Sequence, residues 1–184
     1  MTKHIFTLDE AALAYANVAE RIWAKDTAFL DKNPALVPIF VSNLFQSLEI
    51  SIKHIGISAK LFTEKEARNS PTKAGKKGNG HDVEDLARLA ILAVQNRSQD
   101  SFLAALTCAS NNPYRRAAIT EMIFGERFKK TRECYTSRHL GYGEIVDGDF
   151  SIDTNIEDWI AAVRGVAENS HLAIRILRPW RTGY

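Results

Sequence analysis

The feature that most constrains the fold is a long apolar stretch from Pro34 to Ile57, PALVPIFVSNLFQSLEISIKHIGI. Proline is common at the first helical position, because the N–H that it lacks would have no partner within the helix. Apolar side chains then recur at helical spacing on a broad stripe formed by Leu36, Phe40, Leu44, Leu48 and Ile55, flanked by Val37, Val41 and Phe45. A stripe this broad predicts the central and most buried helix, over Pro34 to Ile55.

Three features of the sequence favour a cytoplasmic protein. The stretch is interrupted by Asn43, Gln46, Glu49 and Lys53, which makes it too polar for a membrane-spanning helix. The beginning, MTKHIFTLDEAALAY, has neither the long apolar region nor the cleavage site of a secretion signal. The two cysteines, Cys108 and Cys134, form no C-x-x-C pair, as expected in a reducing compartment. We therefore expect a cytoplasmic location and no membrane contact.

Helical periodicity continues through most of the chain. A first helix starts at a capping box of Thr7 and Glu10 and ends before Asn33-Pro34. Further helices are expected over 80–94, where Asp82 is the N-cap, over 102–109, from Pro113 onward, and from near Asn155 to Leu177. A brief extended segment is expected only in the turn-rich stretch GYGEIVDGDF. The sequence thus predicts an all-α fold, with residues 1–184 as a single domain.

Charge is distributed unevenly between two expected loops and a basic segment. The segment NSPTKAGKKGNG, residues 69–80, has three glycines and three lysines and predicts a mobile basic loop containing Lys76 and Lys77. Residues 113–142 contain seven cations against three acids, whereas residues 143–160 contain six acids and no cation. The basic segment is therefore a candidate for an anionic ligand, unless the acidic loop at 143–154 neutralises it within the fold.

The most suggestive residues lie in TRECYTSRHLGYG, residues 131–143, where Arg132 and His139 are seven positions apart. On one helix this spacing is two turns, about 10.5 Å, with both side chains on nearly one face. A histidine transfers protons near neutral pH and an arginine stabilises a scissile phosphate, so the pair fits a ribonuclease. Tyr135 and Tyr142 could stack on a base. Alternatively, Arg132, Arg138 and His139 merely complement the carbonyl end of a helix that stops at Gly141.

Other site chemistries find no support in the sequence. The histidines show neither H-x-x-x-H nor H-E-x-x-H spacing, and no Cys/His cluster suggests zinc. The phosphate-binding G-x-x-x-x-G-K-[ST] loop and the G-x-G-x-x-G dinucleotide fingerprint are missing as well. We therefore expect no metal ion and no cofactor.

The order of three short motifs resembles the HEPN (higher eukaryotes and prokaryotes nucleotide-binding) domain family. They are Gln46-x-x-Glu49-x-x-x-Lys53, the helix start Gly80-His81-Asp82-Val83, and Arg138-His139 before the last helix. The family usually has Arg-Tyr-Pro at the third motif, where this chain has Arg138-His139-Leu140. The resemblance covers residues 10–177. It implies an up-and-down bundle of about five helices and a homodimer formed through the long helices.

The resemblance leaves three functions open. The first is non-catalytic binding of a nucleotide, an RNA or a protein partner by Arg132, Arg138, His139 and Tyr142, assisted by Lys76 and Lys77. The second is a metal-independent ribonuclease of the toxin or defence type, with His139 as general acid and base and Arg132 or Arg138 as phosphate clamp. The third is a dimerisation scaffold in which these residues only finish a helix.

Overall fold

A computed structural model of the chain describes residues 7–24, 32–69, 80–94, 97–108, 113–137 and 156–178. Across these ranges there are nine α-helices and two short 3-10 helices, and no strand. The prediction of an all-α fold is confirmed. In these ranges the number of α-helices is nine rather than the five or so that the resemblance implies, in part because two segments expected to be continuous are each divided.

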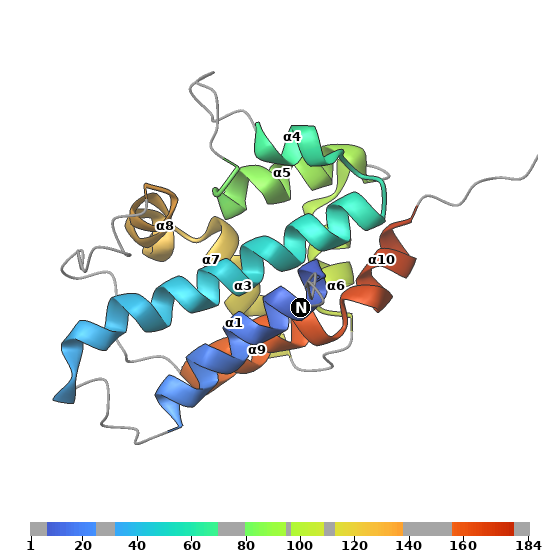
Figure 1. Ribbon diagram of the computed structural model, residues 1–184. Coiled ribbons are helices and arrows are strands. Elements are labelled where there is room, and N and C mark those ends of the chain that lie inside the picture. Colours follow the sequence, from blue (N-terminus) through green and yellow to red (C-terminus); the bar gives the residue numbers. More distant parts are fainter. Residues whose placement is uncertain are drawn as a thin grey trace, which may run out of the picture.

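The centre of the molecule is α3 (Val37–Ser58), which follows the 3-10 turn η1 (Pro34–Leu36) (Figure 1). α1 (Leu8–Trp23) and α9 (Ile156–Glu168) pack along one side of α3, and α5 (Val83–Ala93) packs on another. Phe40, Leu44 and Leu48 of α3 are completely or almost completely buried. The predicted central helix is therefore confirmed, three residues longer than expected at its C-terminal end.

The segment from Pro34 to Ser58 is also long and apolar enough to cross a membrane, with a mean hydropathy of 1.5. The expectation that its polar residues rule out a span on composition alone is therefore wrong. In the folded chain, 56% of the 18-residue window that has this hydropathy is buried inside the molecule. Such burial is what the central helix of a bundle requires, because its apolar stripe must face protein on several sides.

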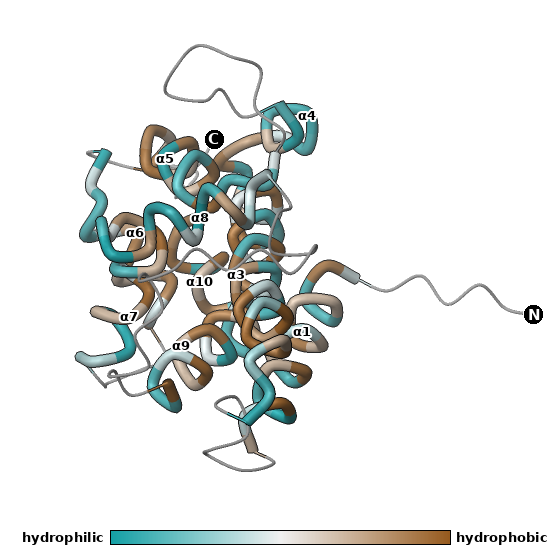
Figure 2. The backbone as a smooth tube through the Cα atoms, turned by 90° about the vertical axis from the view of Figure 1, so that its left-hand side faces the viewer, coloured by the Kyte–Doolittle hydropathy of each residue, from teal (hydrophilic) through white to brown (hydrophobic). Residues whose placement is uncertain are grey.

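The smaller helices surround this centre. They are α4 (Glu64–Arg68), α6 (Gln99–Leu106), α7 (Pro113–Phe124), the 3-10 turn η3 (Glu126–Phe128), α8 (Lys129–Thr136) and α10 (Ser170–Leu177). α6 packs against α10 and α7 against α9. Figure 2 shows α4 as a hydrophilic helix at the edge of the molecule. Short helices are thus stabilised by what they pack on, since isolated helices of this length are marginal in water.

Two breaks distinguish the structure from the expected helices. The last helix, expected to be continuous to Leu177, is divided into α9 and α10 at Asn169, whose side-chain amide donates to the Gly165 carbonyl at 2.9 Å. The basic segment is divided at Gly125, whose φ of −68° and ψ of 139° are extended. A helical α8 then begins at Lys129 and ends at Thr136, before Gly141 is reached.

The predicted N-cap at Asp82 is confirmed. Its carboxylate accepts from the backbone N–H groups of Glu84 at 2.9 Å and Asp85 at 3.1 Å. Gly80, just before it, has a φ of +72°, and a Cβ there would lie 2.8 Å from the Ala67 carbonyl oxygen. Only glycine fits this close approach. Residues 70–79 of the expected basic loop and all of the expected acidic loop at 143–154 lie outside the described residues.

Candidate functional site

A buried carboxylate, that of Glu49, is the hub of the polar contacts between α3, α5 and α8. Its exposed fraction is 4%. Lys53, one turn later on α3, donates to it at 2.6 Å, and the phenol of Tyr135 on α8 donates to its other oxygen. Nδ1 of His81 lies 3.2 and 3.3 Å from the two oxygens. We call Glu49, Lys53, His81 and Tyr135 the Glu49 network.

Local structure explains why these four residues meet. Glu49 and Lys53 are four positions apart, so they lie on the same face of α3. His81 is the residue before the N-cap of α5, and the left-handed backbone at Gly80 precedes it. Tyr135 is the last buried residue of α8. Its ring packs on Phe45 of α3, with centroids 5.5 Å apart, which brings its hydroxyl to Glu49.

The Glu49 network supplies a counter-charge and hydrogen-bond donors to the Glu49 carboxylate, whose burial would otherwise reduce the stability of the fold. A buried carboxylate requires an opposite charge and hydrogen-bond donors, because burial removes its hydration. Lys53 supplies the charge, and Tyr135 and His81 supply further polar contacts. Lys53 and His81 retain 18% and 34% of their side-chain exposure. The network therefore extends from the core to solvent through the ammonium group of Lys53 and the imidazole ring of His81.

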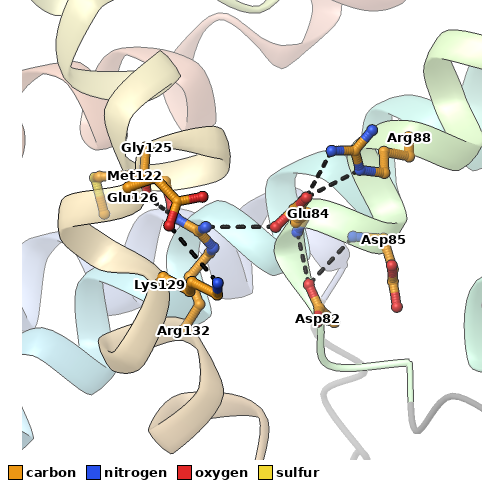
Figure 3. Close-up of polar contacts among 9 residues, drawn as sticks. All are labelled: Asp82, Glu84, Asp85, Arg88, Met122, Gly125, Glu126, Lys129 and Arg132. Carbon is orange, nitrogen blue, oxygen red and sulfur yellow. Dashed lines mark hydrogen bonds and ion pairs between the residues drawn. The ribbon is translucent and has the colours of Figure 1, made fainter. Parts of the chain in front are cut away.

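Arg132, a predicted ligand residue, is buried beside this network, with an exposed fraction of 4%. Its Nη1 donates to the carbonyl oxygens of Gly125 at 2.8 Å and Met122 at 3.3 Å. Its Nη2 lies 3.4 Å from Glu84, which in turn accepts from Arg88 at 2.7 Å (Figure 3). The guanidinium thus joins α8, the end of α7 and the first turn of α5.

This position gives Arg132 a structural role. A cation near the last carbonyls of a helix complements the negative end of its dipole, and here the helix is α7. The structure therefore agrees with the interpretation of Arg132 as a helix-end cation, although the end belongs to a neighbouring helix. The Met122 and Gly125 carbonyls and Glu84 already contact this guanidinium, and a role of Arg132 as a phosphate clamp stays a prediction.

Tyr135 takes the core position that is common for an aromatic residue near a helix end. Its ring is buried between α3 and α8 rather than presented to solvent, so it does not offer a face for a base to stack on. The other predicted site residues, Arg138, His139, Tyr142, Lys76 and Lys77, lie outside the described residues. Their predicted roles remain predictions. Arg138 and His139 follow directly after α8, the helix that Arg132 and Tyr135 anchor.

The sequence contains a partial signal for the Glu49 network. Glu49 and Lys53 are four positions apart in the order that favours an ion pair on a helix, and His81 stands just before the predicted N-cap at Asp82. Nothing local joins them to each other or to Tyr135, which is 86 positions from Glu49. The one signal was that Glu49, Lys53 and His81 all belong to motifs of the HEPN resemblance.

Around the network the described surface carries several cations. Lys129 and Lys130 on α8 are exposed, and Arg88 on α5 has half of its side chain exposed. Lys129 is 3.7 Å from Glu126. In the described residues no group of three or more histidine, cysteine, aspartate or glutamate side chains is placed to hold a metal ion. The exposed cations make the described part of this face a surface that attracts anions.

Comparison of the chain with protein-family models, with curated proteins and with solved structures gave no match.

Proposed function

We propose that the chain is an HEPN-like helical domain that binds a phosphate-bearing ligand, a nucleotide or single-stranded RNA, without cleaving it. The observation that carries the proposal is the Glu49 network. Two of the three motifs of the resemblance meet at Glu49, which contacts Lys53 of its own motif and His81 of the second motif, 32 positions away. Residues that only filled surface positions would have no reason to converge.

The network also supports a place for the ligand. Tyr135 and Arg132 fasten α8 to α3, α5 and α7, which fixes the position of Ser137 at the end of this helix. Arg138 and His139 come next. A phosphate bound there would meet these two side chains, and the exposed Lys129 and Lys130 at the other end of α8 would attract further phosphates of the same strand. We propose Arg138 as the main phosphate contact, since arginine forms paired hydrogen bonds to phosphate oxygens.

Non-catalytic binding is favoured over the ribonuclease because of Arg132. The Arg132/His139 pair requires an arginine that can reach a bound phosphate, and the guanidinium of Arg132 is held by the Met122 and Gly125 carbonyls. A cleavage reaction would have to use Arg138 in its place. The binding experiment below therefore also tests whether the RNA is cleaved.

The test is binding of a fluorescein-labelled single-stranded RNA of about 12 nucleotides, followed by anisotropy. We expect affinity to fall as salt rises from about 50 to about 200 mM, because bound cations release counterions from the phosphates. Arg138→Ala should weaken binding about tenfold or more. Lys76→Ala with Lys77→Ala should weaken it less and flatten the salt dependence. Arg175→Ala, an exposed arginine on α10, is the matched control.

The same samples separate the three functions. Equal binding by the Arg138→Ala and Arg175→Ala proteins would contradict the proposed site. Absence of binding to RNA and to nucleotides at low salt would leave the dimerisation scaffold as the one of the three functions that is still supported. Cleavage of the RNA in the presence of EDTA, abolished by His139→Ala, would establish the ribonuclease.

A further inference from the structure

A cleft of about 620 Å³ lies between α1, α7 and α9 and shares no residue with the Glu49 network. Its volume is in the range of small-molecule sites in proteins. Two arginines, three glutamates and one asparagine line it, together with an apolar wall formed by Trp23, Ala24, Ile160, Ala161 and Gly165. Nothing in the sequence predicted the cleft, because it is built from three separate helices.

The guanidinium of Arg164 is held at its edge by two carboxylates of the protein. Its Nη1 lies 2.5 Å from Glu20 of α1, and its Nε donates to Glu168 at 2.7 Å. Glu168, and secondarily Glu20, raise the pKa of Arg164 above its usual value, so the group stays charged. With these edge donors occupied, Arg164 offers a ligand the planar face of its guanidinium, and such faces stack on aromatic rings.

The two remaining charges of the cleft, those of Arg115 and Glu157, complement helix ends. Arg115 lines a small chamber together with Thr107, the C-cap of α6, and Asn169, the residue after α9. A cation there complements the carbonyl ends of both helices. Glu157 lies in the first turn of α9, where a carboxylate complements the positive end of the dipole. Each charge that lines the cleft thus has a role within the fold, and an uncharged ligand leaves these roles intact.

Trp23 supplies the large apolar surface of the cleft. Its ring contacts Phe40 of α3, with centroids 6.4 Å apart, which fixes its position. Trp23 comes three positions after Glu20 on α1, about 4.5 Å along the helix axis. Because Glu20 holds Arg164, the indole and the guanidinium are about one helical turn apart. One aromatic ring, or two fused rings, can contact both.

Gly165 keeps space in front of this wall. A Cβ added at Gly165 would meet no atom within 4 Å, so packing does not require a glycine inside α9. Glycine in a helix interior is less stable than alanine. Its presence is explained if the volume that a side chain would occupy is needed for something else. In the cleft, that volume is room for a ligand.

We propose that this cleft binds a free, uncharged aromatic molecule of one or two fused rings, which contacts the indole of Trp23 and the guanidinium face of Arg164. An aromatic ring is favoured over an aliphatic group of the same size, because its face interacts with both an indole and a cation. Three carboxylates against two guanidiniums leave the lining net negative, which opposes an anionic ligand, including a base attached to phosphate. The ligand class therefore differs from that of the proposed RNA site.

The test uses indole and phenol as probes, each added to the isotope-labelled full chain at up to about 10 mM. We expect saturable shifts of the Trp23 indole and Gly165 amide signals in NMR spectra. Cyclohexanol has the size of phenol without its aromatic face, and benzoate is an aromatic anion, so both should bind at least about threefold more weakly than phenol. Absence of shifts with both probes overturns the proposal, as does binding of cyclohexanol or benzoate as tight as that of phenol.

Matched variants locate the site. Gly165→Leu places a side chain in the cleft and should abolish binding of indole. Gly165→Ala leaves most of the space open, so it should retain binding and raise the midpoint of thermal unfolding. Arg164→Lys keeps the charge but loses the planar face, and should weaken binding about threefold. Arg175→Lys, at an exposed position on α10, should leave binding unchanged.

Two results with these variants would contradict the proposal. One is an affinity for indole in the Gly165→Leu or Arg164→Lys protein equal to that of the wild type. The other is a lower unfolding midpoint in the Gly165→Ala protein, because the fold itself would then require the glycine. RNA binding should be unchanged in all four variants, so this proposal and that of the RNA site fail independently.

Discussion

At the scale of single residues, the structure depends on how two buried charges are satisfied. Glu49 is neutralised by Lys53 and contacted by Tyr135 and His81, and Arg132 is surrounded by carbonyls and Glu84. Truncating one partner of such a group leaves the other without hydration or a hydrogen bond, which costs more than the contact itself contributes. Both groups therefore have measurable effects on stability.

Tyr135→Phe tests the Glu49 network. The substitution removes one hydroxyl and keeps the ring on Phe45, so the buried carboxylate loses a donor without a change in packing. We expect the free energy of unfolding to fall by about 1 to 3 kcal/mol, measured by urea denaturation. In a double-mutant cycle with Glu49→Gln the two effects should not add. Strict additivity would show that the hydroxyl and the carboxylate do not interact.

Arg132→Met tests the structural role of Arg132. Methionine retains the apolar part of the side chain but leaves the Met122 and Gly125 carbonyls and Glu84 without their donor. We expect a loss of about 3 kcal/mol or more in the free energy of unfolding. Lys130→Met, an exposed position on the same helix, should change it by less than about 0.5 kcal/mol. Equal stability of the two variants would mean that Arg132 is not a structural residue.

Sequence reasoning succeeded at residues whose partners are near in the chain and failed where partners are distant. The cap at Asp82 and the ion pair of Glu49 with Lys53 depend on neighbours within four positions. The contacts of Tyr135 with Glu49 and of Arg132 with Glu84 depend on how helices pack. No periodicity in the sequence encodes which polar side chains will face each other across two helices.

At the scale of elements, the starts of helices were easier to predict than their ends. Pro34, Asp82 and Pro113 mark starts by their own chemistry. The break at Asn169 has no comparable mark, because apolar residues recur at helical spacing in both α9 and α10. Its backbone φ of −107° and its hydrogen bond to Gly165 become evident only in the structure.

The capping box of α4 gives a prediction about pH. Glu66 accepts hydrogen bonds from the backbone N–H of Thr63 at 2.7 Å and from its hydroxyl at 2.8 Å, and these lower the pKa of Glu66 below its usual value. Because the pKa of Glu66 is lower in the folded state, its ionised carboxylate stabilises α4 at pH values above the pKa that Glu66 has in the unfolded chain. This stabilisation is lost as the pH falls through the pKa of Glu66 in the folded state.

An NMR titration of the Glu66 carboxyl carbon measures this effect. We expect a midpoint below the usual 4.5 in the wild type, and a return toward 4.5 in Thr63→Val, which lacks the hydroxyl. Glu64, in the same helix but outside the box, is the internal control. A Glu66 midpoint that does not respond to Thr63→Val would show that the hydroxyl contributes nothing to the box.

At the scale of the whole molecule, the periodicity of one long segment was sufficient to predict the class of fold. An apolar stripe as broad as that of α3 must be covered on several sides, and α1, α5 and α9 cover it. Which helices do so could not be predicted, because α1 and α9 are more than 130 positions apart in the chain. The cleft beside Gly165 arises at this level, from the gap that three helices leave.

The HEPN resemblance predicts a homodimer formed through the long helices. Exposed apolar side chains on α1 and α3, among them Leu8, Val18 and Ile39, are compatible with an additional interface. Light scattering after gel filtration should give twice the 20.6 kDa mass of the chain. Val18→Glu should shift the species toward the monomer, whereas Leu92→Glu, at an exposed position on α5, should not. A monomer at all concentrations would contradict the prediction.

The central claim is that a phosphate-bearing ligand binds where the chain leaves α8, at a point fixed by the Glu49 network. NMR mapping of single-stranded RNA onto the full chain tests it most directly. We predict the largest shifts at Ser137, Tyr135 and His81, with none at Arg115 or Gly165. Shifts confined to the cleft between α1, α7 and α9, or to α10, would contradict the claim.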